Sequence, residues 1–135
     1  MSTQYMLDTD ICIYIAKGRP SQVRDRLKLL KPGSVVISVI TYGELHYGAS
    51  KSDSPDKALA QLDIFLQNIP VEELSRRAAR LYGELRVTLE KKGFPIGNND
   101  LWIAAHAFDL GATLATNNER EFRRIPGLSV ENWAT

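Results

Sequence analysis

The sequence has one cysteine, no long apolar run and almost no net charge, and each of these absences excludes a class of protein. Because Cys12 has no second cysteine to pair with, an intramolecular disulfide is excluded, which favours a reducing compartment. No segment approaches the roughly 20 apolar residues of a membrane-spanning helix, and no charged segment leads into an apolar one at the N-terminus. A net charge of +1 excludes a strong field of one sign around the whole molecule. We therefore expect a cytoplasmic protein with no membrane contact.

Positive charge is nevertheless concentrated in two segments. Residues 19–31 and residues 76–92 are both rich in lysine and arginine and contain few acidic residues. A basic helix face is often simply solvated, and it can equally bind phosphate groups. Both interpretations of these segments stay open at this point.

Short apolar runs alternate with helical patterns along the chain. Strands are expected at residues 4–8, 35–38, 69–71, 113–115 and 128–130. Apolar residues at three- and four-residue spacing predict helices that begin near residues 10, 21, 41, 55, 73 and 101. Such alternation is typical of an α/β protein with a parallel sheet covered on both faces. A chain of 135 residues is long enough for one such domain, so we predict a single domain over residues 1–135.

Three acidic residues each lie where an apolar run gives way to a helical pattern. They are Asp8, Glu44 and Asp100, and a polar cluster at residues 116–118 follows a fourth apolar run. The carboxyl ends of parallel strands form the crevice in which α/β proteins bind ligands, so these groups could meet there. Carboxylates roughly 5 Å apart repel by about 3 kcal/mol per pair at an effective dielectric near 20, and a divalent cation is the simplest way to offset that. The pattern predicts a metal-dependent phosphodiesterase.

Each of these acidic residues also has a simpler interpretation as a helix cap. Asp8 or Asp10 could accept hydrogen bonds at the start of the helix that follows. Thr41 and Glu44 have the spacing of a capping box, and Asp100 could cap the helix near residue 101. Taken singly, capping is the simpler interpretation. Taken together, the metal site is favoured, because a capping carboxylate also lies at the rim of the sheet.

The two histidines are interpreted as core or surface residues and not as metal ligands. His46 follows Glu44 by two positions, so on a helix it points to another face, and His106 lies in an apolar helical segment. Oxygen ligands without a histidine or cysteine set favour Mg²⁺ or Mn²⁺ over Zn²⁺.

Three segments, in their order along the chain, resemble PIN-domain ribonucleases. They are MLDTDICI at residues 6–13, SVITYGEL at residues 38–45 and PIGNNDLWIAAHA at residues 95–107. Among PIN domains, they are most similar to the VapC toxins of bacterial VapBC toxin–antitoxin pairs. The resemblance covers essentially the whole chain.

The resemblance implies a three-layer α/β/α PIN-like domain with a central parallel sheet, which hydrolyses RNA with Mg²⁺ or Mn²⁺ in an acidic pocket. Asp8, Glu44 and Asp100 match the three acidic metal-site and catalytic residues of the family by position. The fourth acidic position falls on Asn118, after Thr116, and is counted with the catalytic group. A neutral amide there removes one negative charge, which leaves one-metal and two-metal catalysis open. Glu121 could substitute for the missing acid.

The resemblance also implies what the protein would bind. The substrate would be a structured RNA such as a transfer RNA or ribosomal RNA loop, cut by metal-activated water to leave 5′-phosphate and 3′-hydroxyl ends. Substrate contacts are expected from Thr9, Thr116, Arg86 and Glu121, with the basic segment 19–31 as a further candidate. A VapB-like antitoxin would cover the pocket, and self-association into a homodimer is common in the family.

A haloacid dehalogenase-like phosphatase is the closest enzymatic alternative. Asp8 and Asp10 after a strand have the spacing of its nucleophile motif. That mechanism would form a phosphoaspartate at Asp8 and would need a lysine to balance the charge. It gives Glu44 no role.

Two further alternatives are not enzymes. A receiver domain would need a phosphorylated aspartate after a central strand near residues 50–57, but Asp53 and Asp56 lie in a segment rich in serine without such a strand. A non-catalytic module that binds nucleic acid or protein remains open, although three clustered carboxylates would repel RNA unless a metal lies between them.

Overall fold

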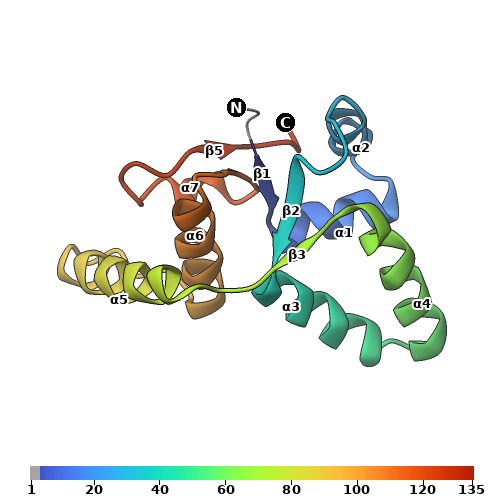
Figure 1. The fold of residues 1–135 in the computed structure, drawn as a ribbon, viewed down its shortest axis with the longest axis horizontal. Helices are drawn as coiled ribbons and strands as arrows, with labels where there is room; N and C mark the ends of the chain where they lie inside the picture. Colours follow the sequence, from blue (N-terminus) through green and yellow to red (C-terminus); the bar gives the residue numbers. More distant parts are fainter. Residues whose placement is uncertain (1–3) are drawn as a thin grey trace.

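A five-stranded parallel sheet forms the centre of the protein, whose computed structural model describes residues 4–135 (Figure 1). Its strands are β1 (Tyr5–Leu7), β2 (Val35–Ser38), β3 (Val71–Glu72), β4 (Thr113–Ala115) and β5 (Val130–Glu131). The strand order is β3-β2-β1-β4-β5. The chain therefore builds the sheet outward from β1 in one direction and then returns to build it in the other direction. This reversal places a topological switch point between β1 and β4.

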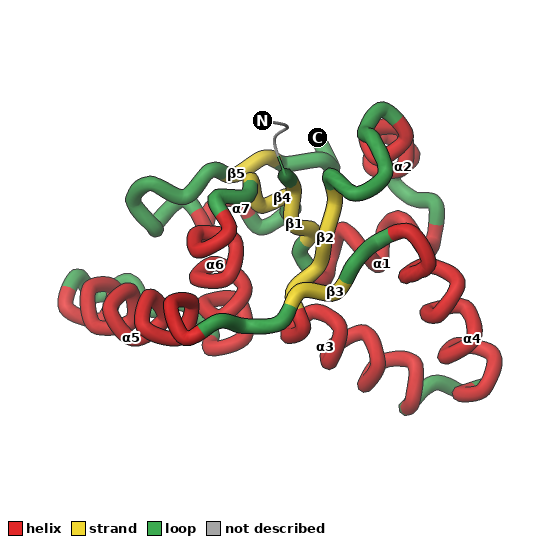
Figure 2. The backbone as a smooth tube through the Cα atoms, in the orientation of Figure 1, coloured by secondary structure: helices red, strands yellow, loops and turns green. Residues whose placement is uncertain are grey.

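Helices cover both faces of the sheet, which confirms the predicted three-layer α/β/α architecture (Figure 2). They are α1 (Thr9–Lys17), α2 (Ser21–Lys28), α3 (Val39–Ser50), α4 (Pro55–Phe65), the 3₁₀ helix η1 (Leu66–Asn68), α5 (Arg76–Lys91), α6 (Asn98–Leu110) and α7 (Glu119–Phe122). Helices α5, α6 and α7 pack on one face, and α1, α2, α4 and η1 pack on the other. No helix within residues 4–135 is long and apolar enough to cross a membrane.

Successive residues of the short strands face opposite layers. Met6 packs into the core beneath α6 and α7, whereas Leu7 packs into the core beneath α1. Both side chains are fully buried. Because both faces of the sheet are covered, the central strands β1 and β2 consist mostly of apolar residues and do not alternate apolar with polar ones. The register pairs Leu7 with Ala115, so β1 and β4 end side by side.

Two helices begin earlier than the sequence pattern predicted. Helix α3 begins at Val39 because the Ser38 hydroxyl accepts a hydrogen bond from the Ile40 N–H at 3.1 Å. Thr41 is buried inside α3, so the capping-box interpretation of Thr41 and Glu44 is wrong. Helix α6 begins at Asn98, where the predicted start was near residue 101. Glu44 lies past the first turn of α3, which frees its side chain to reach the edge of the sheet.

The cysteine and one histidine are core residues, and for the histidine this agrees with the sequence analysis. Cys12 is buried, and burial raises the pKa of its thiol, which leaves it uncharged and unreactive. His106 is fully buried, with its Nδ1 2.8 Å from the Ser38 hydroxyl. Burial lowers the pKa of His106, so the ring packs as a neutral group. His46 is exposed on α3.

Helix α7 was not predicted, and one buried aromatic side chain holds it. Phe122 is fully buried in the core formed with α6. Replacement by alanine would leave a cavity, so we expect Phe122→Ala to lower the free energy of unfolding by about 3–5 kcal/mol in urea denaturation. The control is Phe94→Ala, because Phe94 is 56% exposed and its loss should change stability by about 0.5 kcal/mol or less. Equal losses for the two variants would show that Phe122 does not anchor α7.

Candidate active site

Asp8 and Thr116 meet at the switch point of the sheet. Asp8 follows β1 and Thr116 follows β4, and the Asp8 N–H donates to the Ala115 carbonyl at 2.8 Å. The Thr116 hydroxyl donates to Asp8 Oδ2 at 2.7 Å, and the Thr9 N–H donates to Asp8 Oδ1 at 2.8 Å. The capping role of Asp8 is therefore confirmed. The same side chain lies at the crevice where α/β proteins bind ligands.

Glu44 reaches this edge from α3 and contacts two other elements. The Thr9 hydroxyl donates to Glu44 Oε1 at 2.6 Å, and the Asn99 side-chain amide donates to Oε2 at 3.4 Å. Asn99 lies beside Asp100 in the first turn of α6. The charge of Glu44 in turn acts on Asp100 and raises its pKa. The structure thus brings Asp8, Glu44 and Asp100 together.

The segment after β4 adds a fourth carboxylate through Glu121. The Glu121 carboxyl lies close enough to Asp100 to raise the pKa of Asp100. The Asn118 side-chain amide donates to Glu121 Oε2 at 3.1 Å, and the Asn118 N–H donates to the Thr116 hydroxyl at 2.9 Å. Asn118 therefore contacts Glu121 directly and holds it next to Asp100.

The carboxylates repel one another in a pocket that is partly shielded from water. Burial, and then the charge of Asp10, raises the pKa of Asp8 to about 7 against the hydrogen bonds from Thr116 and Thr9. Burial, and then the charges of Glu121 and Glu44, raises the pKa of Asp100 to about 7. Buried like charges favour protonation in this way. At neutral pH the pocket therefore favours the binding of a positive charge.

The donor set fits a divalent ion bound by oxygen atoms. Asp10 Oδ1 and Glu121 Oε1 are buried and have no hydrogen-bond partner among the described residues. A buried carboxylate oxygen without a hydrogen-bond partner lowers the free energy of unfolding, and a bound cation would offset that loss. Within residues 4–135 no three acidic, histidine or cysteine side chains already surround one point as ligands.

A groove of about 740 Å³ opens beside Glu44. Its lining comes from the N-terminus of α1, from α3 and from the first turn of α6, and includes Thr9, Ile13, Glu44, Tyr47, Lys51 and Asn99. Tyr47 is 65% exposed, and the Lys51 ammonium lies 4.7 Å from its ring centroid. The groove therefore offers an aromatic face and a positive charge beside the carboxylates.

Arg86 is connected to the turn that carries Asp100. Its Nη1 donates to the Tyr82 hydroxyl at 3.0 Å, and that hydroxyl donates to Asn98 Oδ1 at 3.2 Å. Tyr82 also stacks on Trp102 with ring centroids 3.8 Å apart. The Arg86 side chain is 47% exposed, so part of its guanidinium remains open to a ligand.

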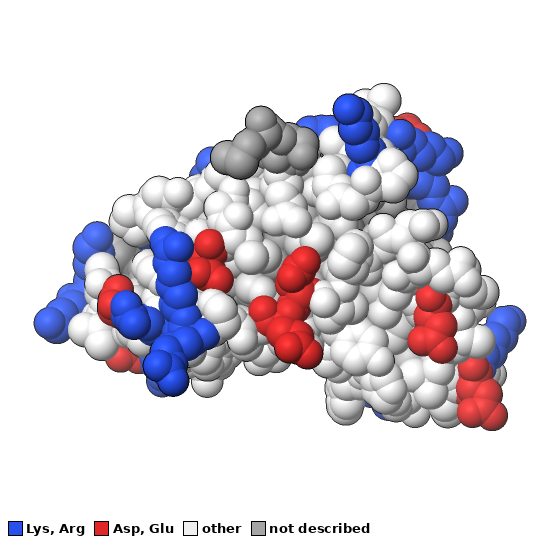
Figure 3. Space-filling model, viewed as in Figure 1, with Lys and Arg blue, Asp and Glu red and all other residues white. Residues whose placement is uncertain are grey.

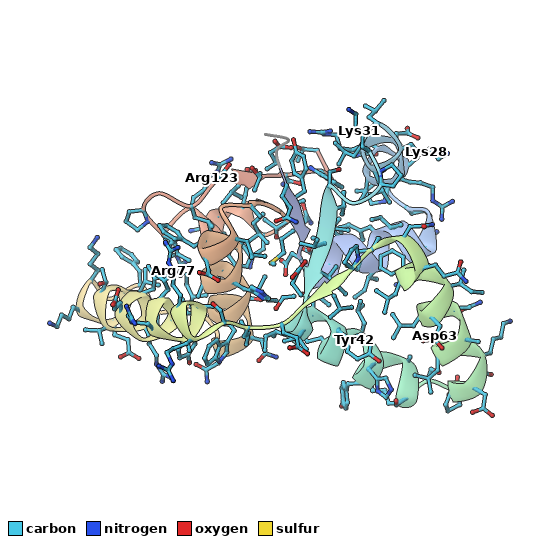
Figure 4. The ribbon with its side chains drawn as sticks, viewed as in Figure 1. Lys28, Lys31, Tyr42, Asp63, Arg77 and Arg123 are labelled. Atoms are coloured by element: carbon cyan, nitrogen blue, oxygen red, sulfur yellow. The ribbon has the colours of Figure 1, made fainter. Side chains whose placement is uncertain are left out.

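The basic segment 19–31 lies elsewhere on the molecule. Lysines and arginines gather over α2 and over α5 in the view of Figure 3. Lys31 is four residues before the start of β2, so it lies toward the amino ends of the strands, as Figure 4 shows together with Lys28. Arg24 donates to the Ile15 carbonyl at 2.7 Å, and Arg26 pairs with Glu131 at 3.2 Å. The basic residues of segment 19–31 therefore do not lie beside the carboxylates of the site.

Sequence reasoning gave Asp10 a capping role or a place in a phosphatase motif and did not count it in the metal site, but the structure places it beside Asp8. Asp10 Oδ2 accepts a hydrogen bond from the Asn117 N–H at 3.1 Å, and its charge raises the pKa of Asp8. The signal available in the sequence was its spacing of two residues from Asp8, on the same turn after β1.

The fold and site can now be compared with known proteins. The PIN domain family matches residues 5–128. The chain belongs to the PIN-domain family. Ribonuclease VapC2 of Rickettsia felis is 48% identical over 130 residues, which cover 96% of this PIN domain and 97% of the relative. The tRNA(fMet)-specific endonuclease VapC of Shigella flexneri is 42% identical over 131 residues, which cover 97% and 98% of the two chains.

Solved structures agree with this assignment. The crystal structure of VapBC2 from Rickettsia felis bound to a promoter DNA fragment matches this PIN domain with a TM-score of 0.91 and 45% identity over 97% of this chain and 99% of that one. DNA-bound VapBC from Salmonella typhimurium matches with a TM-score of 0.91 and 41% identity, covering 98% and 99%. The expected resemblance to VapC ribonucleases is thereby confirmed.

The comparisons and the structure do not support the phosphatase and receiver-domain alternatives. The PIN-domain match does not favour the haloacid dehalogenase alternative, and the charged groups that act on Asp8 are acidic, whereas that mechanism needs a lysine. The receiver-domain alternative is not supported, because Asp53 lies in a bend between α3 and α4 and Asp56 lies in α4. Neither follows a strand.

The raised pKa values predict how stability depends on pH. An unfolded aspartate has a pKa near 3.9, whereas Asp8 and Asp100 in the ion-free fold have pKa values of about 7. Between these values the folded state binds more protons, so these groups reduce the free energy of unfolding as pH rises from about 4 to about 7. We expect Asp8→Asn to raise the melting temperature more near pH 8 than near pH 5, measured in EDTA.

The control for that melting experiment is Asp63→Asn, an exposed aspartate on α4 (Figure 4). It should shift the melting temperature equally little at both pH values. A gain from Asp8→Asn that is the same at both pH values would contradict the repulsion argument.

Proposed function

We propose that this PIN domain, spanning residues 1–135, is a Mg²⁺- or Mn²⁺-dependent endoribonuclease that acts as the toxin of a type II toxin–antitoxin pair. The observation that carries the proposal is the convergence of Asp8, Glu44 and Asp100 at the switch point of a PIN fold. The VapC names of relatives at 48% and 42% identity support it.

Asp8, Glu44 and Asp100 would hold the ion, with Glu121 beside them. A bound divalent ion lowers the pKa of water and offsets charge on phosphate oxygens. Thr116 and the Thr9 N–H fix the orientation of Asp8, while the Thr9 hydroxyl fixes Glu44. Carboxylate oxygens that remain free of the ion orient the attacking water by accepting its hydrogen bond.

The substrate proposed is a structured RNA, with a transfer RNA or ribosomal RNA loop as its target. Unstacked loop bases are accessible to side chains, whereas the bases of an RNA helix are not. The groove beside Glu44 has room for a single strand, with Tyr47 and Lys51 on its wall. Arg86 would bind a backbone phosphate near the turn that carries Asp100. The Shigella relative is named for tRNA(fMet), which favours transfer RNA.

The partner proposed is a VapB-like antitoxin that covers the pocket. Solved relatives of this PIN domain are VapBC complexes, and two of them are bound to DNA. A homodimer of the toxin and a cytoplasmic location are part of the same proposal.

An RNA cleavage assay tests the proposed activity. We expect discrete fragments of total RNA with Mg²⁺ or Mn²⁺ and none with EDTA, and about 100-fold or more slower cleavage by Asp8→Asn. The reason is that an ion stabilises charge in the transition state by several kcal/mol, and each 1.4 kcal/mol is tenfold in rate. Asparagine is also a good N-cap, so this variant should fold.

Asp63→Asn is the control in the cleavage assay and should cut RNA at the wild-type rate. Intact RNA with every metal, using folded protein free of antitoxin, would favour a non-catalytic binding module. Cleavage that persists in EDTA would contradict the metal requirement.

Arg86→Gln tests phosphate binding by α5. The change removes the charge of Arg86 together with its ion pair to Glu90 at 3.1 Å. We expect the KM for RNA to rise several-fold with little change in kcat, and the slope of log affinity against log salt to fall by about 1. Lys28→Gln, at the far end of the molecule, should change neither. Equal effects of the two variants would mean that Arg86 makes no specific contact.

A further inference from the structure

The two carboxylate oxygens of Asp10 have different surroundings. Oδ2 accepts the Asn117 N–H at 3.1 Å and so fastens the segment after β4 to the first turn of α1. Oδ1 is buried and has no hydrogen-bond partner among residues 4–135. The Asp10 carboxyl also lies close enough to Asp8 for its charge to raise the pKa of Asp8. The hydrogen bond from Asn117 gives Oδ2 a structural role, but no contact gives one to the buried Oδ1.

The site lacks one negative charge at Asn118. This residue occupies the position where the resemblance to PIN ribonucleases places a fourth acid, and its amide donates to Glu121. The segment that Asp10 fastens is the one that carries Asn118. Asp10 is therefore next to the position at which the charge is missing.

We propose that Asp10 is a further acidic residue of the divalent-ion site, in addition to Glu121, and supplies the negative charge that Asn118 lacks. Its unpaired Oδ1 and the neighbouring Asp8 carboxylate would contact the same ion, while Oδ2 keeps the loop at Asn117 in place. The inference rests on the metal dependence proposed above. It assigns Asp10 a role in ion affinity that a purely structural tie would not have.

Asp10→Asn separates the two roles. The amide oxygen can still accept the Asn117 N–H, so the loop keeps its tie, and only the charge is lost. Loss of one carboxylate weakens ion binding. Mutation of a residue that supports a metal site typically lowers metal affinity by 10–100-fold. Removal of charge next to Asp8 should leave the ion-free protein as stable as the wild type or more stable.

The experiment is a calorimetric titration of Mn²⁺ into the folded protein, without RNA, for the wild type, Asp10→Asn and Asp63→Asn. We expect Asp10→Asn to bind Mn²⁺ at least about 10-fold more weakly, with an unchanged or higher melting temperature in EDTA. Asp63→Asn should match the wild type. An unchanged affinity for Asp10→Asn, with the wild type binding normally, overturns the role of Asp10 and leaves the proposed nuclease intact.

Asn118→Asp provides a second test that does not alter Asp10. Asn118 is exposed, so the variant should fold. If the site is short of one carboxylate, Asn118→Asp should bind Mn²⁺ more tightly than the wild type and should restore affinity in the Asp10→Asn background. No gain in either background would overturn the charge argument. Absence of Mn²⁺ binding by the wild type would overturn the metal requirement itself, and the role of Asp10 with it.

Discussion

Repulsion among buried carboxylates at the end of β1 is the constraint on which the rest of this structure depends. Asp8 is 5% exposed and lies beside Asp10, and burial and neighbouring acids raise the pKa of Asp8 and of Asp100 to about 7. A fold selected only for stability would not gather these groups. The protein therefore gives up stability in the ion-free state to keep an arrangement that a cation can use, as functional sites commonly do.

The scaffold limits that cost through helix ends and hydroxyl groups. Asp8 caps α1 and Asp100 lies in the first turn of α6, where the positive end of the helix dipole favours negative charge. Thr9 and Thr116 donate to Glu44 and Asp8 at 2.6 and 2.7 Å. Each carboxylate is thus held by groups that orient it without cancelling its charge. A lysine or arginine in their place would pair with the carboxylates and compete with the ion.

The sequence predicted the layers and the three principal acids, because these depend on local patterns. Strands β2 and β4 have the predicted bounds, since each is a short apolar run between clear breaks. The start of α3 was missed because Ser38, the last residue of β2, is also a helix cap, which periodicity does not reveal. The start of α6 was missed because its first turn, from Asn98, is polar and follows Gly97, which offers no side-chain cap. The role of Asp10 could not be predicted, because its partner Asn117 is 107 residues away. Only the register of β1 with β4 brings the two together.

That same register makes ion binding and the order of the C-terminal segment interdependent. Thr116 contacts Asp8, Asn117 contacts Asp10, and Asn118 holds Glu121 against Asp100. Three consecutive residues after β4 thus each hold a carboxylate of the site. A cation that binds these carboxylates strengthens contacts between segments more than 100 residues apart. It should therefore stabilise the packing of α7 as well as the pocket. Conversely, a change that loosens α7, such as one at Phe122 on its buried face, should weaken ion binding, because the coupling between two linked equilibria acts in both directions.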